Sequence, residues 1–111
     1  MRRLFLPLTI TGLLCLSVLS LSPNVCAQAG AAALYKTNCV LCHAADGSGN
    51  SPSGKALKAK DLGSSDVQKQ SDADLTMAIT HGKGKMPAFG KKLKPEDIKQ
   101  LVAYVRTLAK K

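Results

Sequence analysis

Cys39-Val40-Leu41-Cys42-His43 has the pattern C-x-x-C-H, and this stretch decides how the rest of the 111-residue chain is interpreted. The two thiols are separated by two residues, a spacing that lets them add to the two vinyl groups of one porphyrin. The imidazole of His43 follows directly and can reach the iron from the same face of the ring. The pattern therefore predicts covalent attachment of a c-type haem, with Cys39 and Cys42 as thioether links and His43 as an axial iron ligand.

Two other kinds of site also use closely spaced cysteines. A thioredoxin-like redox pair is expected within a βαβ unit, and no such pattern surrounds Cys39 and Cys42. A zinc site needs a second pair of ligands, and the chain contains no cysteine after Cys42. The remaining cysteines, Cys15 and Cys26, fall in a predicted leader, so no disulfide is expected in the mature chain.

The first 27 residues have the layout of a secretory signal peptide. Two arginines supply positive charge, residues 4–21 form an apolar stretch, and Ala27 is a small residue suited to cleavage. We therefore expect a signal peptide at 1–27, one domain at 28–111 and export to the periplasm. An uncleaved membrane anchor is the alternative, because the apolar stretch approaches the minimum length of a membrane span.

Basic residues exceed acidic ones by 16 to 7, which gives a net charge of +9. Removing the two arginines of the leader leaves 14 against 7, or +7. Such a balance suits nucleic acid, anionic lipid or an acidic protein partner. No nucleic-acid recognition motif is present. We therefore expect redox protein partners with acidic docking surfaces, no nucleic acid, no stable membrane insertion once the signal is cleaved, and a monomer.

Helical patterns dominate the chain after the leader. The alanine-rich stretch 28–38 favours a first helix. Residues 46–54 are polar and rich in glycine, which is typical of a loop, and a short helical turn is expected at 55–60. Ser71, with Asp74 three residues later, predicts the start of another helix.

The last helix has the clearest sequence pattern. Pro95 is suited to the first helical position, and two acidic residues follow it, where they interact favourably with the helix dipole. Its predicted buried residues recur at helical intervals: Ile98, Leu101, Val102, Val105 and Leu108. No stretch shows convincing strand alternation, so the expected fold class is all-α.

Met86 is the candidate for the second axial ligand of the iron. It lies 43 residues beyond His43, between glycines and next to a proline, and a loop can carry a thioether to iron without bending a helix. Thioether sulfur favours ferrous iron and raises the reduction potential relative to a second imidazole. Met77 falls inside a predicted helix and is assigned to haem contact or core packing. His81 could bind iron instead, or could interact with the end of its helix.

These features resemble one known family. Residues 31–45, with Leu34-Tyr35-Lys36 leading into the C-x-x-C-H motif, are similar to the N-terminal part of a bacterial class I cytochrome c. Residues 79–89, Ile-Thr-His-Gly-Lys-Gly-Lys-Met-Pro-Ala-Phe, resemble the distal methionine loop of its small c6-like and c551/c555-like members. The resemblance covers essentially the whole chain after residue 27. It implies three to five helices around one covalently bound haem c with its iron, and terminal helices that cross near Ala31 and Tyr104.

The resemblance also implies a function. The expected protein is a periplasmic one-electron carrier of a respiratory chain, cycling iron between Fe(III) and Fe(II) with His43 and Met86 as axial ligands. Because both axial positions are filled by the protein, we expect an electron-transfer protein and no enzyme. Two alternatives remain: a haem enzyme or gas-binding protein of the peroxidase kind with a labile sixth ligand, and an electron-transfer subunit of a larger oxidoreductase.

Five lysines flank the predicted methionine loop: Lys83, Lys85, Lys91, Lys92 and Lys94. In the family this loop covers the exposed haem edge. These lysines would then surround the path of the electron and steer an acidic redox partner toward it. A solvated face that only keeps the protein soluble is the alternative.

Overall fold

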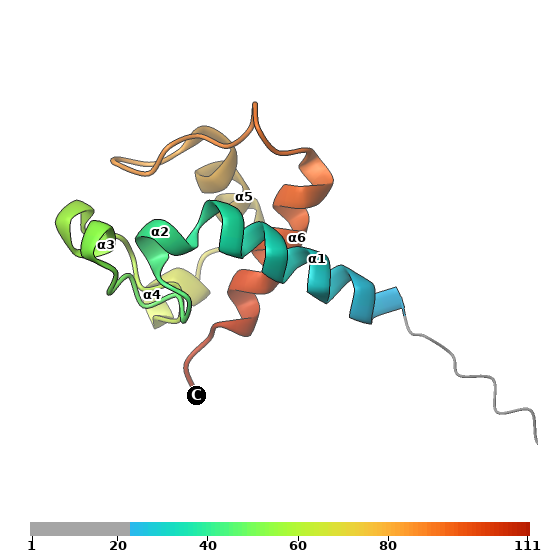
Figure 1. Ribbon diagram of the computed structural model, residues 1–111, viewed down its shortest axis with the longest axis horizontal. Helices are drawn as coiled ribbons and strands as arrows, with labels where there is room; N and C mark the ends of the chain where they lie inside the picture. The colour runs from blue at the N-terminus through green and yellow to red at the C-terminus, as the bar shows by residue number, and fades with distance from the viewer. Residues whose placement is uncertain (1–22) are drawn as a thin grey trace, which may run out of the picture.

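The computed structural model describes residues 23–111, which are shown in colour in Figure 1. Most of the predicted signal peptide lies outside these residues. The described part is helical and holds no strand, only an isolated bridge between Lys83 and Met86. Its helices are α1 (Pro23–Asn38), α2 (Val40–His43), α3 (Pro52–Leu57), α4 (Ser65–Gln68), α5 (Asp72–His81) and α6 (Pro95–Thr107). Four of them exceed a single turn of four residues, so the all-α prediction of three to five helices is confirmed.

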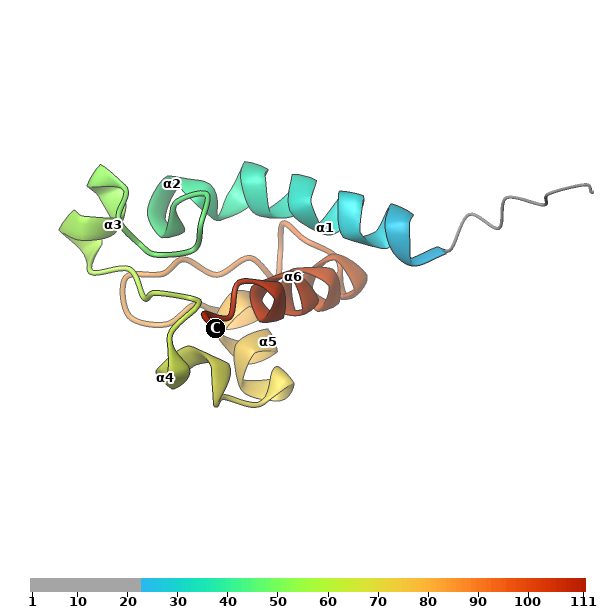
Figure 2. The same cartoon turned by 90° about the horizontal axis from the view of Figure 1, so that it is seen from below.

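The first and last helices pack across each other. Figures 1 and 2 both show α1 lying over α6. Ala31 and Tyr35 of α1 are buried, and Leu101 of α6 is 1% exposed. The rings of Tyr35 and Tyr104 lie 4.8 Å apart between centroids, at 36°. A small residue at Ala31 allows the close approach, so the predicted crossing is confirmed.

A second set of apolar contacts covers the other side of α6. It contains Val67 of α4, Leu75 of α5, and Val102 and Val105 of α6. Figure 2 shows α6 between α1 on one side and α4 and α5 on the other. The stripe predicted for the last helix is therefore buried from both sides, apart from its last member, Leu108, which lies at the C-cap and is half-buried.

Two helices begin earlier than the sequence pattern indicated. The first starts at Pro23 rather than at residue 28, because proline suits the first helical turn and residues 24–27 contain no helix breaker. The third starts at Pro52 rather than at residue 55, where the side chain of Ser51 accepts a hydrogen bond from the backbone N–H of Gly54. No helix within residues 23–111 is long and apolar enough to cross a membrane.

Candidate haem site

The C-x-x-C-H motif occupies a single helical turn directly after α1. The backbone N–H of Cys39 donates to the carbonyl of Tyr35 at 2.9 Å, which continues the hydrogen bonding of α1 into the motif. The N–H groups of Cys42 and His43 both donate to the carbonyl of Cys39, at 3.2 and 2.9 Å. Residues three and four apart on a helix share a face, so both thiols and the imidazole project from one side of the turn.

The two thiols are free and half-buried. Burial raises the pKa of the Cys39 thiol to about 11, and the neighbouring Cys42 adds to the rise. A redox-active or nucleophilic cysteine needs a lowered pKa, because the thiolate is the reactive form. The environment of Cys39 therefore does not favour the reactive thiolate that a catalytic thiol pair would need.

The imidazole of His43 is oriented by a backbone carbonyl. Its Nδ1 lies 3.0 Å from the carbonyl oxygen of Lys60, in the loop between α3 and α4. Since that oxygen only accepts, Nδ1 carries the proton and Nε2 keeps its lone pair for a metal. Such outer partners fix the tautomer and ring orientation of a ligating histidine. Sequence reasoning missed Lys60, because its contribution is a main-chain atom that no side-chain pattern reveals.

The backbone of α3 packs directly against the motif. A Cβ placed on Gly54 would lie 2.0 Å from the carbonyl oxygen of Cys42, so only glycine fits there. The hydroxyl of Ser51 reaches the carbonyl oxygens of Leu41 and Cys42 at 2.7 and 3.0 Å. Sequence reasoning assigned Ser51 and Gly54 to a flexible loop. The Ser-Pro pair that starts α3 was the available signal for this contact.

Met86 is half-buried in a loop that is fixed to α5. Lys83 and Met86 exchange backbone hydrogen bonds of 3.2 and 3.0 Å, which close the turn containing Gly84. Further along, the N–H of Phe89 donates to the carbonyl of Ile79 at 2.9 Å. A Cβ on Gly82 would lie 2.5 Å from the carbonyl oxygen of Met86, so the loop returns closely onto its own start.

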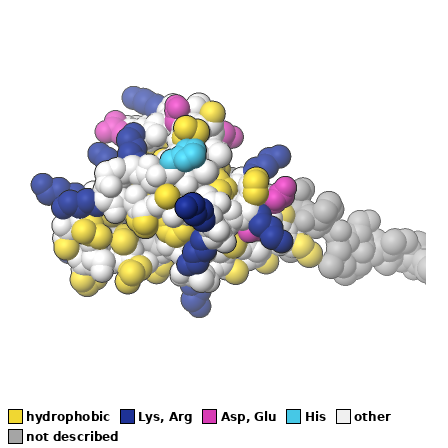
Figure 3. Space-filling model, turned by 90° about the horizontal axis from the view of Figure 1, so that it is seen from above, with side chains coloured by type: hydrophobic (Ala, Val, Ile, Leu, Met, Phe, Trp, Pro, Cys, Tyr) yellow, Lys and Arg dark blue, Asp and Glu magenta, His cyan; other side chains and the backbone are white. Residues whose placement is uncertain are grey.

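The remaining candidate residues lie on the surface. Met77 is 57% exposed on α5, so its assignment to core packing is wrong in this structure. His81 is the last residue of α5 and is exposed. The five lysines that flank the methionine loop are also exposed: Lys83, Lys85, Lys91, Lys92 and Lys94. Figure 3 shows Lys and Arg side chains projecting from a face that also presents hydrophobic side chains.

The residues around the motif fit a large apolar group with an iron at its centre. Helix α2 has no buried residue, and the only buried residue of α3 is Gly54. Leu41 and Leu57, on these two helices, are 74% and 42% exposed. The donors are also suitable: two free thiols, a histidine with Nε2 available, and a thioether. The described part of the chain holds no group of three His, Cys, Asp or Glu side chains such as a zinc site would require.

Comparisons with known proteins agree with this site. The family described as "Cytochrome C oxidase, cbb3-type, subunit III" matches residues 27–105. Cytochrome c6 of Aphanizomenon flos-aquae is 44% identical over 77 residues, which are 67% of this chain and 82% of that protein. Cytochrome c6 of a Nostoc species is 34% identical over 107 residues, or 95% of this chain and 92% of that protein.

Two further matches extend the comparison. The cbb3-type cytochrome c oxidase subunit FixP of Azorhizobium caulinodans is 38% identical over 79 residues, which are 69% of this chain and 26% of that protein. The solved structure of the KustC0563 c-type cytochrome has a TM-score of 0.67 and 34% identity, and the match covers 72% of this chain and 98% of that one. The chain is thus an electron-transfer protein rather than an enzyme, and its cofactor is covalently bound haem c with iron. On its sequence matches, its fold and its C-x-x-C-H turn, the chain belongs to the cytochrome c family, as a small class I member.

Proposed function

We propose that this protein is a periplasmic one-electron carrier in which His43 and Met86 are the axial iron ligands and Cys39 and Cys42 form the thioether links. The observation that carries the proposal is the hydrogen bond between Nδ1 of His43 and the carbonyl of Lys60, which leaves Nε2 available. Haem c, when bound, supplies an iron that alternates between Fe(III) and Fe(II).

The protein's own residues supply rigidity. The single helical turn fixes both thiols and the imidazole, and the carbonyl of Lys60 sets the ring orientation of His43. The loop of Met86 is tied to α5 by backbone hydrogen bonds, so this ligand needs little rearrangement when the iron changes charge. With both axial positions held by protein, no position is open to a substrate, which favours the carrier over a peroxidase-like or gas-binding protein.

The lysines define the proposed docking surface. Lys83, Lys85, Lys91, Lys92 and Lys94 are exposed on one continuous segment, and they would attract a redox protein with an acidic surface. Such contacts raise the encounter rate and weaken with salt. We expect a respiratory donor such as a quinol-oxidising complex or a dehydrogenase, an acceptor such as a terminal oxidase, and a carrier that is monomeric.

A second candidate is an electron-transfer subunit of a larger oxidoreductase. It is favoured by the match to the cbb3-type subunit III family and by the relative that is itself an oxidase subunit. The two candidates differ in association: the carrier purifies alone at moderate salt, whereas the subunit copurifies with a membrane complex.

Export through a signal peptide at 1–27 completes the proposal. Cleavage after Ala27 would fall within α1 and leave a mature chain that starts at Gln28 and keeps Ala31 and Tyr35 of the helix crossing. Intact mass measurement of the exported protein tests it. A mass equal to residues 28–111 plus one haem supports cleavage, and retention of residues 1–27 would support the membrane anchor.

The ligand assignment is tested by visible spectra of the exported protein. We expect a sulfur-to-iron charge-transfer band in the ferric form and no spectral shift with carbon monoxide. Met86→Ala should lose the band and gain the shift, while Met77→Ala, at an exposed position, should change neither. A high-spin or carbon monoxide-reactive wild type would contradict the proposal. A bis-histidine spectrum that is lost in His81→Ala would replace Met86 by His81.

A further inference from the structure

The loop that supplies the carbonyl for His43 is braced by the C-terminal tail of the chain. This inference rests on the proposed function, because it assumes that His43 binds the iron. The relevant oxygen belongs to Lys60 and lies 3.0 Å from Nδ1 of His43. What fixes that oxygen in space is therefore part of the iron site, although it lies outside the ligand residues.

The carbonyl of Lys60 belongs to the same planar peptide unit as the N–H of Asp61. Any contact that fixes Asp61 therefore also limits rotation of this carbonyl. The carboxylate of Asp61 accepts a hydrogen bond from the backbone N–H of Gly63 at 3.0 Å. Its backbone carbonyl accepts one from the hydroxyl of Ser64 at 2.7 Å. Asp61 is thus held by its side chain and its main chain in a tight local turn.

The tail after α6 completes this turn from outside the loop. The ammonium group of Lys110 pairs with the second carboxylate oxygen of Asp61. The backbone N–H of Lys110 donates to the carbonyl of Gly63 at 3.1 Å. A Cβ on Gly63 would lie 2.5 Å from the carbonyl oxygen of Leu108, so the two segments are in close contact.

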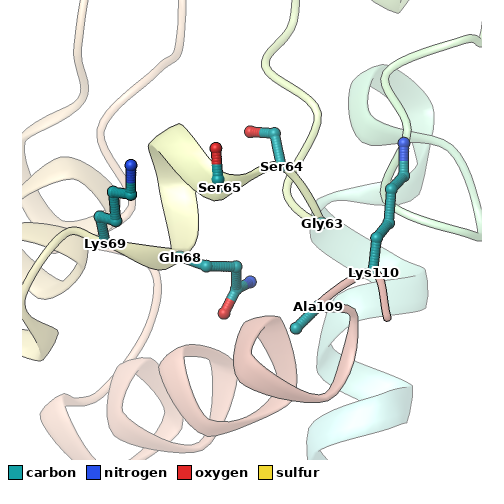
Figure 4. A pocket seen from close by; sticks show the side chains of 7 residues that line it. All are labelled: Gly63, Ser64, Ser65, Gln68, Lys69, Ala109 and Lys110. Carbon is teal, nitrogen blue, oxygen red and sulfur yellow. The ribbon is translucent and has the colours of Figure 1, made fainter.

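A cavity of about 440 Å³ lies between α4 and the end of the chain. Figure 4 shows Gly63, Ala109 and Lys110 around it, with Lys110 extending along the side of Gly63. Leu62, the neighbour of Asp61, packs against the apolar cluster of α4, α5 and α6, and the polar bonds just described add to this contact.

We propose that Asp61 and Lys110 are positioning residues for the proximal ligand: their ion pair holds the 60–61 peptide plane so that the Lys60 carbonyl stays on Nδ1 of His43. A carbonyl at Nδ1–H makes the imidazole a more basic ligand. A more basic ligand stabilises Fe(III) and lowers the reduction potential. The C-terminal tail thereby contributes to the potential of the carrier.

The direction of the potential shift separates this role from a simple charge effect. If Lys110 acts on the iron only through its charge, removing that charge would favour Fe(III) and lower the reduction potential. Releasing the Lys60 carbonyl would weaken the hydrogen bond to His43 and raise the potential. Lys110→Gln therefore gives opposite signs under the two explanations, whereas Asp61→Asn raises the potential under both.

The experiment measures the reduction potential of the haem-loaded protein by protein-film or solution voltammetry. Lys110→Gln and Asp61→Asn should both raise the potential, and Lys110→Arg, which keeps the cation, should leave it near the wild-type value. Lys111→Gln is the matched control, since it removes the same charge from the same tail. The second readout is solvent exchange of the Nδ1 proton of His43 by NMR, which should become several-fold faster in both single variants and stay unchanged in Lys111→Gln.

Other results would overturn the inference. One such result is a lower or unchanged potential in Lys110→Gln together with an unchanged exchange rate, in a protein whose wild type shows the His/Met spectrum. Asp61 and Lys110 would then form only a surface ion pair with no effect on His43. A wild type without that spectrum would overturn the proposed function and this inference together. Because the pair is partly exposed, thermal unfolding should show that all the single variants remain folded.

Discussion

The two ends of this molecule are stabilised in different ways. Where α1 crosses α6, the burial of apolar side chains stabilises the contact. Tyr35 and Leu101 are almost fully buried, and α6 carries four buried apolar residues. Around the C-x-x-C-H turn, α2 has no buried residue and α3 only Gly54. The helix crossing can form from the chain's own apolar surface. The ligand end, which comprises α2, α3 and the methionine loop, is instead held by hydrogen bonds to backbone atoms and by close glycine contacts.

This difference shows how a short chain carries a large prosthetic group. A domain of this size has limited apolar surface to bury, and this chain concentrates it at α6. The ligand end lacks a core of its own because the haem is the apolar body expected there. We therefore expect the two ends to respond differently when the haem or a core side chain is removed.

The largest effect is expected from Cys39→Ala combined with Cys42→Ala, which prevents covalent attachment of the haem. The ligand end, made up of α2, α3 and the methionine loop, should lose its amide protection, with opening free energies of about 0 kcal/mol. Residual protection should be greater in α6. Hydrogen exchange with mass spectrometry compares this variant with the haem-loaded protein, and equal loss of protection throughout would break the proposed distinction.

A core substitution should give the next largest effect. Leu101→Ala removes a side chain that is 1% exposed at the helix crossing, and it should destabilise the protein by about 2–5 kcal/mol. Lys99→Ala, at an exposed position of the same helix, is the matched control and should change stability by about 0.5 kcal/mol or less. Denaturant unfolding measures both, and an effect at Lys99 as large as that at Leu101 would contradict the assignment of the core to the buried face of α6.

The helix crossing could be predicted from the sequence because it depends on periodic side chains. The stripe from Ile98 to Val105 is buried as expected, and the aromatic contact of Tyr104 lies where the family resemblance placed it. The motif residues were also recognisable, since their chemistry is specific to the residue types. These features are encoded by side chains at fixed spacing, and a single sequence displays them directly.

The support of the site could not be predicted in the same way. The carbonyl of Lys60, the approach of Gly54 to Cys42 and the contact of Lys110 with Asp61 all join segments that are distant in the sequence. Two of these contacts use main-chain atoms, which every residue has. Sequence patterns do not show which carbonyl faces which side chain, so the contacts that hold the ligand residues in place appear only in the folded chain.

The methionine loop offers a matched pair of glycine substitutions. Gly82 has φ +76° and a Cβ there would meet the carbonyl of Met86 at 2.5 Å, so Gly82→Ala should cost about 1–3 kcal/mol. Gly84 has φ +58° with no atom within 4 Å of a Cβ, so Gly84→Ala should cost only about 1 kcal/mol. The ferric charge-transfer band should weaken in the first variant and persist in the second; the reverse order would contradict the loop geometry.

Tyr35 contacts both ends of the molecule, so removing its hydroxyl oxygen tests whether the two ends are coupled. Its hydroxyl donates to the carbonyl of Ala44 at 2.7 Å, just after His43, while its ring packs in the helix crossing. Tyr35→Phe keeps the ring and should lower stability by about 1 kcal/mol. Hydrogen exchange should locate the loss near Ala44 rather than in α6. Loss confined to α6 would show that the hydroxyl does not brace the ligand end.

The smallest effect is expected from acid, at the braced loop of the ligand end. Pairing with Lys110 lowers the pKa of Asp61 below its ordinary value of 3.8, and the hydrogen bond from Gly63 adds to this. A lowered carboxyl pKa gives stability that is fully present above the ordinary value and is lost as the pH falls through the folded-state value. In an NMR titration of this carboxyl group, Lys110→Gln should raise its pKa and Lys111→Gln should leave it unchanged. Because the helix crossing contains no buried charged side chain, acid should loosen the ligand end before it loosens α1 and α6. If protection in α6 fell first, the ion pair would not be a brace of the iron site.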